Sequence, residues 1–322
     1  MNIKIYISVV VTFLVVLAGA FIWVTATPSH KNESSFSVVT SFYPLYFFAS
    51  EIAGPYAEVR NITPAGAEPH HFEPTPRDII TIEQSDILFI NGGGFEPWAE
   101  DIRVTLGGEN TSVVAVSEGL MSREAEHDDH NDHEEEAHES EEEEAHEKDP
   151  HVWLSPLYAL RMIETIRDEM IAHDPVHADW YKTNSAVLVK KLETLHRVYT
   201  DKLAVCRTRT IVTTHTAFGY LAETYELEQI PIAGISPESE PSPYQLAALT
   251  EFIRSERVTH VFFETLASPR LAETLAEETG AKTLVLNPLE GLSRPELAAG
   301  EDYFSVMYAN LDNLTEALGC TL

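Results

Sequence analysis

Short apolar runs alternate with helical patterns over residues 36–173. The apolar runs predict four strands, at 37–42, 57–63, 86–92 and 112–116. Helical patterns lie between them, from Pro44 to Ala53 and from Pro76 to about Ser85. Strands that alternate with helices at this spacing indicate βαβ units and a parallel sheet.

Two helices are predicted after an acidic stretch. The first covers 156–173, and Asp174 with Pro175 suits the N-cap and the first position of the second. The second helix keeps one apolar face, at Leu188, Leu192, Leu195, Tyr199 and Leu203. It runs to about Val205, and a helix of about 30 residues is about 45 Å long. That length is enough to cross two small domains.

A second alternation of strands and helices fills the remainder of the chain. Its expected strands are 209–215, 227–234, 258–264 and 282–287, and a helix over 302–318 closes the chain. The pattern predicts an α/β fold of two small, sandwich-like βα domains with mainly parallel sheets, joined by one long helix. We expect the N-terminal domain at 36–173, the connecting helix at 174–206 and the C-terminal domain at 207–322.

The charge of the chain limits its partners. The net charge is −31, which makes nucleic acid and anionic membrane surfaces poor partners, and we expect no binding to nucleic acid. Residues 123–149 hold fifteen acidic and two basic side chains, a local net charge of −13. Such a composition cannot build a core, so we expect a disordered loop at 120–149.

The N-terminus indicates export. Lys4 precedes an uncharged run from Ile5 to Ala26, which reads either as a signal peptide cleaved after Ala26 or as an uncleaved membrane anchor. No cysteine lies near the run, which excludes a bacterial lipoprotein anchor. Residues 27–35 then form a short polar linker. We therefore expect the folded part in the periplasm or on the outer face of the cytoplasmic membrane.

The two cysteines of the chain are Cys206 and Cys320. An oxidising compartment allows them to form a disulfide, and two free buried thiols are the alternative. The expected disulfide would connect the last helix to the start of the second sheet.

Histidines in predicted loops form the main candidate site. The stretch "PHHFEP" places His70 and His71 after the second predicted strand. His215 and Glu290 each closely follow a strand of the second half, and His151 precedes a helix of the first half. Ligands of open α/β sheets bind beyond the carboxyl ends of strands, so the four residues His70, His151, His215 and Glu290 could meet between the domains. Three imidazoles and one carboxylate suit Zn²⁺, although each histidine taken alone is as easily solvated or packed in a core.

The motifs resemble a known family over the chain from about Phe36 to its end. "EPHHFEP", "DPHVWLSP", "THTAFGYLA", "SPESEPSP", "FFETLASP" and "LNPLEGL" resemble, in order, those of the zinc-binding solute receptors of ABC importers, the cluster A-I group. The resemblance implies two α/β domains joined by a rigid long helix, with the metal bound between them. It also implies a non-catalytic, monomeric receptor that captures Zn²⁺ and delivers it to an importer permease.

The resemblance also assigns individual residues. The first histidine of the family's P-H-[DE]-[FY]-E-P motif is the ligand, which corresponds to His70, and His71 stands where the family usually has Asp. Glu290 matches the fourth ligand of one zinc-binding subgroup, whereas Asn287 occupies a place where other members have an aspartate ligand. The acidic tract resembles the family's histidine-rich loop, which implies weak zinc capture or sensing by His127, His130, His133, His138 and His146.

Two other functions remain open at this point. An extracellular zinc hydrolase would need an open ligand position for water, and "HEEEAH" at 133–138 has one residue too many for the H-E-x-x-H motif. A surface adhesin that uses zinc structurally is the other alternative, because some relatives are described as adhesins.

Overall fold

The computed structural model describes residues 36–106, 111–123, 148–237, 239 and 241–321. The predicted leader or anchor at 5–26, the linker at 27–35 and the histidines of the acidic tract lie outside these residues. Within the described residues, none of the helices has the length and apolar character needed to cross a bilayer. Residues 36–322 form one compact unit.

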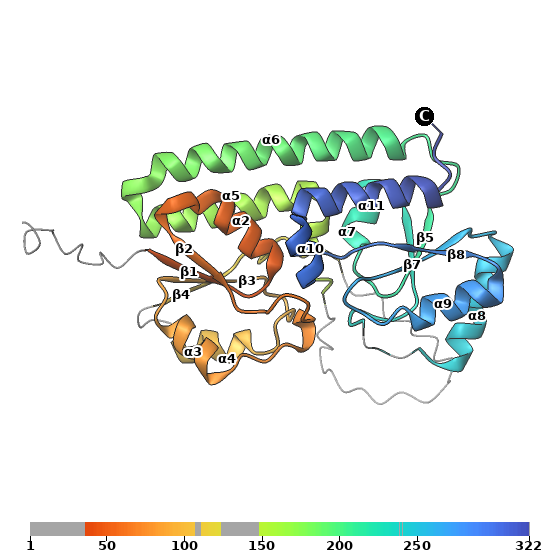
Figure 1. The fold of residues 1–322 in the computed structure, drawn as a ribbon, viewed down its shortest axis with the longest axis horizontal. Helices are drawn as coiled ribbons and strands as arrows, with labels where there is room; N and C mark the ends of the chain where they lie inside the picture. The colour runs from red at the N-terminus through yellow and green to blue at the C-terminus, as the bar shows by residue number, and fades with distance from the viewer. Residues whose placement is uncertain (1–35, 107–110, 124–147, 238, 240, 322) are drawn as a thin grey trace, which may run out of the picture. The chain divides into compact units, whose positions relative to one another are not determined.

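The first lobe contains a four-stranded parallel sheet in the order β2-β1-β3-β4 (Figure 1). Its strands are β1 (Ser37–Thr40), β2 (Glu58–Asn61), β3 (Ile87–Ile90) and β4 (Ser112–Ala115). Its helices are α2 (Tyr43–Ala53), α3 (Pro76–Glu83), α4 (Ala99–Leu106) and α5 (Pro156–His173). The parallel βαβ units predicted from the alternating pattern are therefore present.

The second lobe repeats this arrangement with the strand order β6-β5-β7-β8, again all parallel. Its strands are β5 (Thr210–Thr213), β6 (Glu228–Pro231), β7 (His260–Phe263) and β8 (Lys282–Val285). Its helices are α7 (Gly219–Thr224), α8 (Pro243–Ser255), α9 (Arg270–Thr279), α10 (Arg294–Ala299) and α11 (Tyr303–Ala317).

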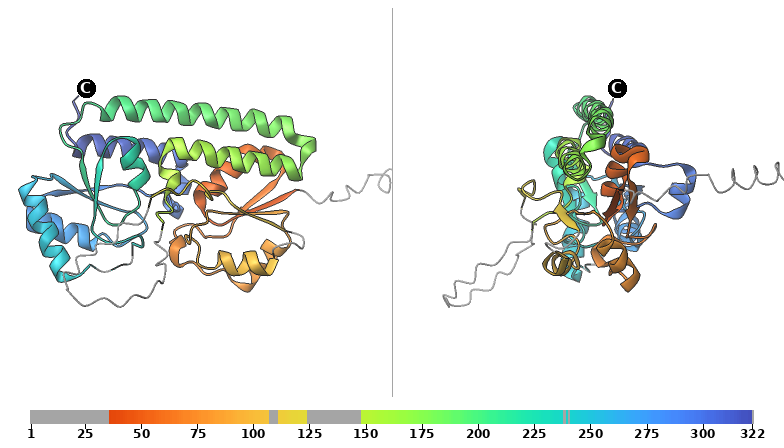
Figure 2. Two further views of the ribbon diagram at one scale, coloured as in Figure 1. Left: turned by 180° about the vertical axis from the view of Figure 1, so that it is seen from behind. Right: turned by 90° about the vertical axis from the view of Figure 1, so that its left-hand side faces the viewer.

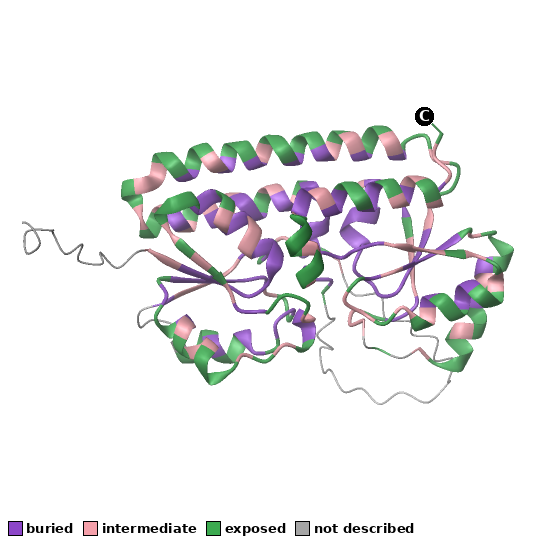
Figure 3. Ribbon diagram, in the orientation of Figure 1, coloured by how far each residue is buried: buried purple, intermediate pink, exposed green. Residues whose placement is uncertain are grey.

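The long helix α6 (Ala178–Leu203) lies along both lobes, packed against α2 and α5 of the first and α11 of the second (Figures 1 and 2). The five positions of its predicted apolar face are all buried, and exposed residues cover its outer side (Figure 3). Its 26 residues give a length of about 39 Å.

The predicted start of this helix was wrong by a few residues. Asp174 does not cap α6, because a 3-10 turn, Pro175–His177, comes first. The carboxylate of Asp174 instead accepts hydrogen bonds from Nδ1 of His177 and the hydroxyl of Tyr181, each at 2.6 Å. These two bonds occupy the carboxylate that would otherwise cap the helix.

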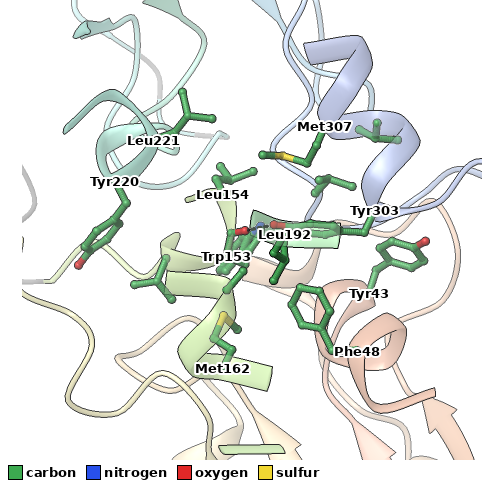
Figure 4. Close-up of a cluster of buried hydrophobic side chains, with 14 of the residues drawn as sticks. Tyr43, Phe48, Trp153, Leu154, Met162, Leu192, Tyr220, Leu221, Tyr303 and Met307 are labelled. Atoms are coloured by element: carbon green, nitrogen blue, oxygen red, sulfur yellow. Dashed lines mark hydrogen bonds between the residues drawn. The ribbon is translucent and has the colours of Figure 1, made fainter. Parts of the chain in front are cut away.

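One hydrophobic core extends through both lobes. It includes Phe42 and Phe48 from the first lobe, Phe262 and Met307 from the second, and Trp153 between them. Figure 4 shows Trp153 in the middle of this cluster, with Leu192 of α6 and Tyr303 of α11 near it. The indole Nε1 donates a hydrogen bond to the Pro288 carbonyl at 2.8 Å, and the Tyr303 hydroxyl donates to the Trp153 carbonyl at 2.6 Å. The lobes are thus connected by packing as well as by α6.

The expected disulfide between Cys206 and Cys320 is present. Cys206 follows α6 and Cys320 follows α11, so the bond joins the ends of the two helices that lie along the second lobe.

The ends of the tract predicted to be disordered, 120–149, belong to the folded protein. Met121 and Asp149 are buried, and the Asp149 amide donates a hydrogen bond to the Arg123 carbonyl at 3.2 Å. These residues are held because they contact the second lobe: the Tyr220 hydroxyl of α7 accepts from the Arg123 amide and donates to the Asp149 carbonyl. The predicted tract was therefore too long at both ends.

Candidate metal centre

Four side chains from four separate segments converge between the lobes. They are the predicted set His70, His151, His215 and Glu290, and one potential ligand atom from each lies within 4.8 Å of all the others. All four are buried, with exposed fractions between 0% and 8%. The first lobe contributes His70 and His151, and the second contributes His215 and Glu290.

His70 lies on a 3-10 turn, Pro69–His71, in the loop after β2. The carboxylate of Glu68 caps this turn, accepting hydrogen bonds from the amides of His70 at 2.9 Å and His71 at 3.2 Å. The ring of Phe95 packs edge-on against the His70 imidazole at a centroid distance of 4.6 Å. The turn fixes the backbone of His70 and Phe95 restricts rotation of its imidazole, so that Nε2 faces the centre of the site.

His151 immediately precedes a short 3-10 turn that leads into α5. Its Nδ1 lies 2.8 Å from Oδ1 of Asp149, which also accepts a hydrogen bond from the His151 amide at 2.9 Å. Both groups are almost fully buried. An Nδ1–H donated to a carboxylate leaves the lone pair on Nε2, the atom that faces the other ligands.

His215 follows β5 and is fully buried. Its Nδ1 lies 2.6 Å from Oε1 of Glu264, a residue directly after β7. The hydroxyl of Thr214 donates to the same oxygen of Glu264. The His215 imidazole is therefore held in the same way as that of His151, by a carboxylate on the nitrogen that faces away from the site.

Glu290 lies in the loop after β8, where Leu289 has a positive φ of 56°. The side chain of Asn287 shapes this loop, because its Oδ1 accepts from the Leu289 amide at 2.8 Å. The Asn310 side chain of α11 bonds both the amide and the carbonyl of Asn287. Asn287 therefore builds the loop, and Glu290 is the residue whose carboxylate reaches the site.

The spacing of these atoms matches a tetrahedral zinc site. Oε1 of Glu290 lies 3.5 Å from Nε2 of His70, 3.3 Å from Nε2 of His151 and 3.2 Å from Nε2 of His215. The Nε2 atoms of His70 and His151 are 3.3 Å apart. Ligands about 2.0–2.1 Å from a central Zn²⁺ at tetrahedral angles lie about 3.3–3.4 Å from each other. These four distances are therefore close to those between the ligands of a tetrahedral zinc site.

The electrostatics of the site favour positive charge at its centre. Burial alone would lower the pKa of His215, but the charge of Glu264 and hydrogen bonds to Glu264 and Glu290 raise it to about 10. Burial likewise opposes the charged form of His151, and hydrogen bonds to Asp149 and Glu290 raise its pKa nevertheless. Burial would raise the pKa of Glu290, yet hydrogen bonds from His151 and His215 hold it well below its usual range. A divalent cation supplies the positive charge that this arrangement stabilises.

His71 does not join the four residues. Its side chain is exposed, and its Nε2 lies 3.0 Å from the hydroxyl of Ser236 in the second lobe. His260 is buried on β7 and does not belong to the four residues. His127, His130, His133, His138 and His146 lie outside the described residues.

Sequence reasoning missed the two carboxylates that contact the imidazole ligands. Asp149 stands two residues before His151 in "DPH", and Glu264 ends the apolar run "VFFE" at the same edge of the sheet as His215. Both signals are visible in the sequence. Asp149 is two residues from the histidine that it contacts, whereas the contact of Glu264 with His215 depends on the packing of separate segments and is not identified by spacing.

Comparisons with known proteins identify relatives of this chain. A family model described as "Zinc-uptake complex component A periplasmic" matches residues 38–317. The high-affinity zinc uptake system protein ZnuA of Bacillus subtilis (strain 168) is 39% identical over 312 residues, which are 95% of this chain and 97% of that protein. The zinc-binding lipoprotein AdcA of Streptococcus pneumoniae (strain ATCC BAA-255 / R6) is 36% identical over 309 residues, and the match covers 95% of this chain but 60% of AdcA.

Solved structures give the same result. The Zn(II)-bound ZnuA-like domain of Streptococcus pneumoniae AdcA aligns with a TM-score of 0.74 and 36% identity, covering 88% of this chain and 99% of that one. The laminin binding protein of Streptococcus agalactiae, described as bifunctional with adhesin and metal transporting activity, aligns with a TM-score of 0.75 and 33% identity, over 88% of this chain and 99% of that one.

Proposed function

This chain belongs to the family of periplasmic zinc-uptake components, and from that premise we propose that it is an extracytoplasmic receptor that binds Zn²⁺ and delivers it to the membrane permease of an ABC-type importer. Zn²⁺ is the cargo, and His70, His151, His215 and Glu290 are its ligands. The observation that carries the proposal is the spacing of these four buried side chains. Oε1 of Glu290 lies 3.2–3.5 Å from Nε2 of each histidine, and the Nε2 atoms of His70 and His151 are 3.3 Å apart.

The donor set supports a receptor in preference to a hydrolase. Catalytic zinc sites keep one coordination position for water, whereas three imidazoles and a carboxylate complete a tetrahedron with protein atoms alone. The ligands also come in pairs from two lobes, so a change in the angle between the lobes would separate the pairs. Such a site suits binding and release of the ion.

The same donors favour Zn²⁺ over Mn²⁺. Imidazole nitrogen suits zinc, harder ions prefer more oxygen ligands, and the general affinity order also places Mn²⁺ well below Zn²⁺. His215 supplies much of this preference. His215→Glu should reduce the difference in affinity between Zn²⁺ and Mn²⁺, because it replaces a nitrogen ligand with a hard oxygen ligand.

The experiment that tests the proposal is metal analysis of the purified chain followed by competition between Zn²⁺ and Mn²⁺. We expect one tightly bound Zn²⁺ per chain, released reversibly and without turnover of any substrate. His215→Ala should lower the zinc affinity by orders of magnitude, and His71→Ala is the matched control, since His71 neighbours a ligand but is exposed. If His71→Ala loses tight binding while His215→Ala keeps it, the ligand assignment is wrong.

Two further parts of the proposal rest on sequence alone. Residues 5–26 hold the receptor at the membrane or are removed during export. The histidines of the acidic tract, His127 to His146, capture zinc weakly near the receptor. Removal of the tract should leave the tight site intact, which separates the two kinds of binding in a titration.

A further inference from the structure

The two buried carboxylates that contact the imidazole ligands define a second set of functional residues. Asp149 contacts Nδ1 of His151 at 2.8 Å, and Glu264 contacts Nδ1 of His215 at 2.6 Å. Neither carboxylate belongs to the group of four convergent ligand residues. We propose that Asp149 and Glu264 are positioning residues, one in each lobe, that set the tautomer, the direction and the basicity of the imidazoles that bind the metal. This inference rests on the proposed zinc site and names the residues that tune it.

Both contacts have the geometry that this role requires. A carboxylate accepts only, so each Nδ1 must carry a proton, and when the ring is neutral its Nε2 presents the lone pair to the metal. Nε2 is the atom of both rings that lies 3.2–3.3 Å from Oε1 of Glu290, on the side of the metal. Carboxylates that hold metal-binding histidines in this way fix the ring and make it a better donor.

Each carboxylate is itself held in place, which separates a positioning role from a chance contact. Glu264 is buried and accepts a second hydrogen bond, from the Thr214 hydroxyl. Asp149 is 1% exposed, and its Oδ1 also accepts from the His151 amide. Side chains fixed at two points cannot rotate away from the imidazoles without leaving a charge unpaired in the interior.

Asp149 is also enclosed by Arg123 of its own lobe and by α7 of the opposite lobe. Nε of Arg123 lies 4.0 Å from its Oδ2, and the Tyr220 hydroxyl of α7 donates to its carbonyl at 3.1 Å. Gly219, the first residue of α7, comes so close that a Cβ there would lie 2.6 Å from Oδ2 of Asp149. A helix of the second lobe therefore bonds the backbone of Asp149 and lies close to the carboxylate that contacts His151.

This contact gives a test that touches no ligand. Gly219→Ala adds one methyl group that must displace Asp149 or Arg123. Alanine is the better helix former, so loss of α7 would not explain a defect in metal binding. We expect the variant to bind zinc at least tenfold more weakly than the parent.

Direct substitutions test the charge. Glu264→Gln and Asp149→Asn keep the size of each side chain but remove its charge, and the amide N–H₂ can donate to Nδ1 and thereby favour the tautomer with the proton on Nε2. We expect zinc affinity to fall about 10–100-fold in each variant. Glu96→Gln is the matched control: Glu96 is a buried carboxylate of the first lobe whose hydrogen bonds come from Ser41 and from the amides of Asn91 and Gly92, not from the imidazoles of the site.

The closing experiment measures Zn²⁺ affinity by competition with a chromophoric chelator, and the visible absorption spectrum of the Co²⁺-loaded protein, for the parent and the four variants. Thermal unfolding of the metal-free proteins verifies that each folds. A role confined to stability would lower the melting temperature but leave the Co²⁺ spectrum unchanged, whereas a positioning role changes the spectrum.

We expect weaker zinc binding and an altered Co²⁺ spectrum for Glu264→Gln, Asp149→Asn and Gly219→Ala, and parental values for Glu96→Gln. Variants that fold and match the parent within twofold, with the parental spectrum, would overturn the inference and leave the receptor function standing. A parent protein that binds no zinc would overturn both together.

Discussion

Replacement of Trp153 by phenylalanine tests whether the two lobes share one core at the level of the metal site. Trp153 is fully buried, and its ring packs against those of Phe42, Phe95 and His151 at centroid distances of 4.7, 5.0 and 5.2 Å. Its Nε1 donates to the carbonyl of Pro288 in the loop that carries Glu290. This single side chain therefore joins ligand-bearing segments of both lobes.

The expected cost of Trp153→Phe follows from these contacts. Loss of the N–H leaves the buried carbonyl of Pro288 without its donor, which costs about 1–3 kcal/mol. The smaller ring leaves a cavity, which adds about 1 kcal/mol. We therefore expect the free energy of unfolding to fall by about 2–4 kcal/mol, while phenylalanine keeps most of the aromatic packing.

Urea unfolding of the metal-free protein, followed by far-ultraviolet circular dichroism, measures this cost. Trp180→Phe is the matched control, because Trp180 is 39% exposed on α6, and we expect that variant to lose less than about 1 kcal/mol. Parent and variants should each unfold in one transition, because the core is continuous. Equal costs for the two tryptophans, or separate unfolding of the lobes, would refute a shared core.

Three further predictions concern the site, the disulfide and the acidic tract. At pH 8 the metal-free His215, whose pKa is raised to about 10, carries a proton that Zn²⁺ must displace. Calorimetry in two buffers of different ionisation enthalpy should therefore detect proton release on zinc binding. The apparent zinc affinity should also fall as the pH falls. The absence of proton release at pH 8 would contradict this protonation state. The double variant Cys206→Ser/Cys320→Ser should lose up to about 4–5 kcal/mol of stability, since the bond spans a sequence separation of 114 residues; urea unfolding of both forms measures it, and an unchanged midpoint would count against it. Deletion of 124–147 should leave the tight zinc site and the fold intact. Loss of high-affinity binding in a zinc titration of the deletion variant would mean that the tight site lies in the tract.

Much of the fold is readable from local sequence patterns. Apolar runs bounded by turn residues located the eight strands of the described residues, and the helix at 156–173 was predicted with the bounds of α5. The apolar face of α6 was also correct, because spacing by three and four residues is a property of the helix itself. The predicted first residue of α6 was wrong. Asp174 accepts hydrogen bonds from His177 and Tyr181 instead of capping the helix, and these contacts depend on how the side chains pack.

Three of the candidate ligands were predicted from their places after strands, His151 from its loop before a helix, and all four from a resemblance to a family; the structure brings the four together. The sequence assigned no role to Asp149 and Glu264, whose carboxylates contact two of these histidines. The contact of Glu264 with His215 spans 49 residues of sequence, and Asp149 is held by α7 of the opposite lobe.

The sequence by itself therefore determined the elements, their order and the residue types suited to zinc, because these depend on periodicity and side-chain chemistry within short segments. Only the tertiary structure decided which atoms face one another. The distance between His70 and Glu290, 220 positions apart in the chain, is set by the packing of both lobes around Trp153 and α6. No local pattern encodes a separation of 3.5 Å between such atoms, because every residue that packs between them contributes to it.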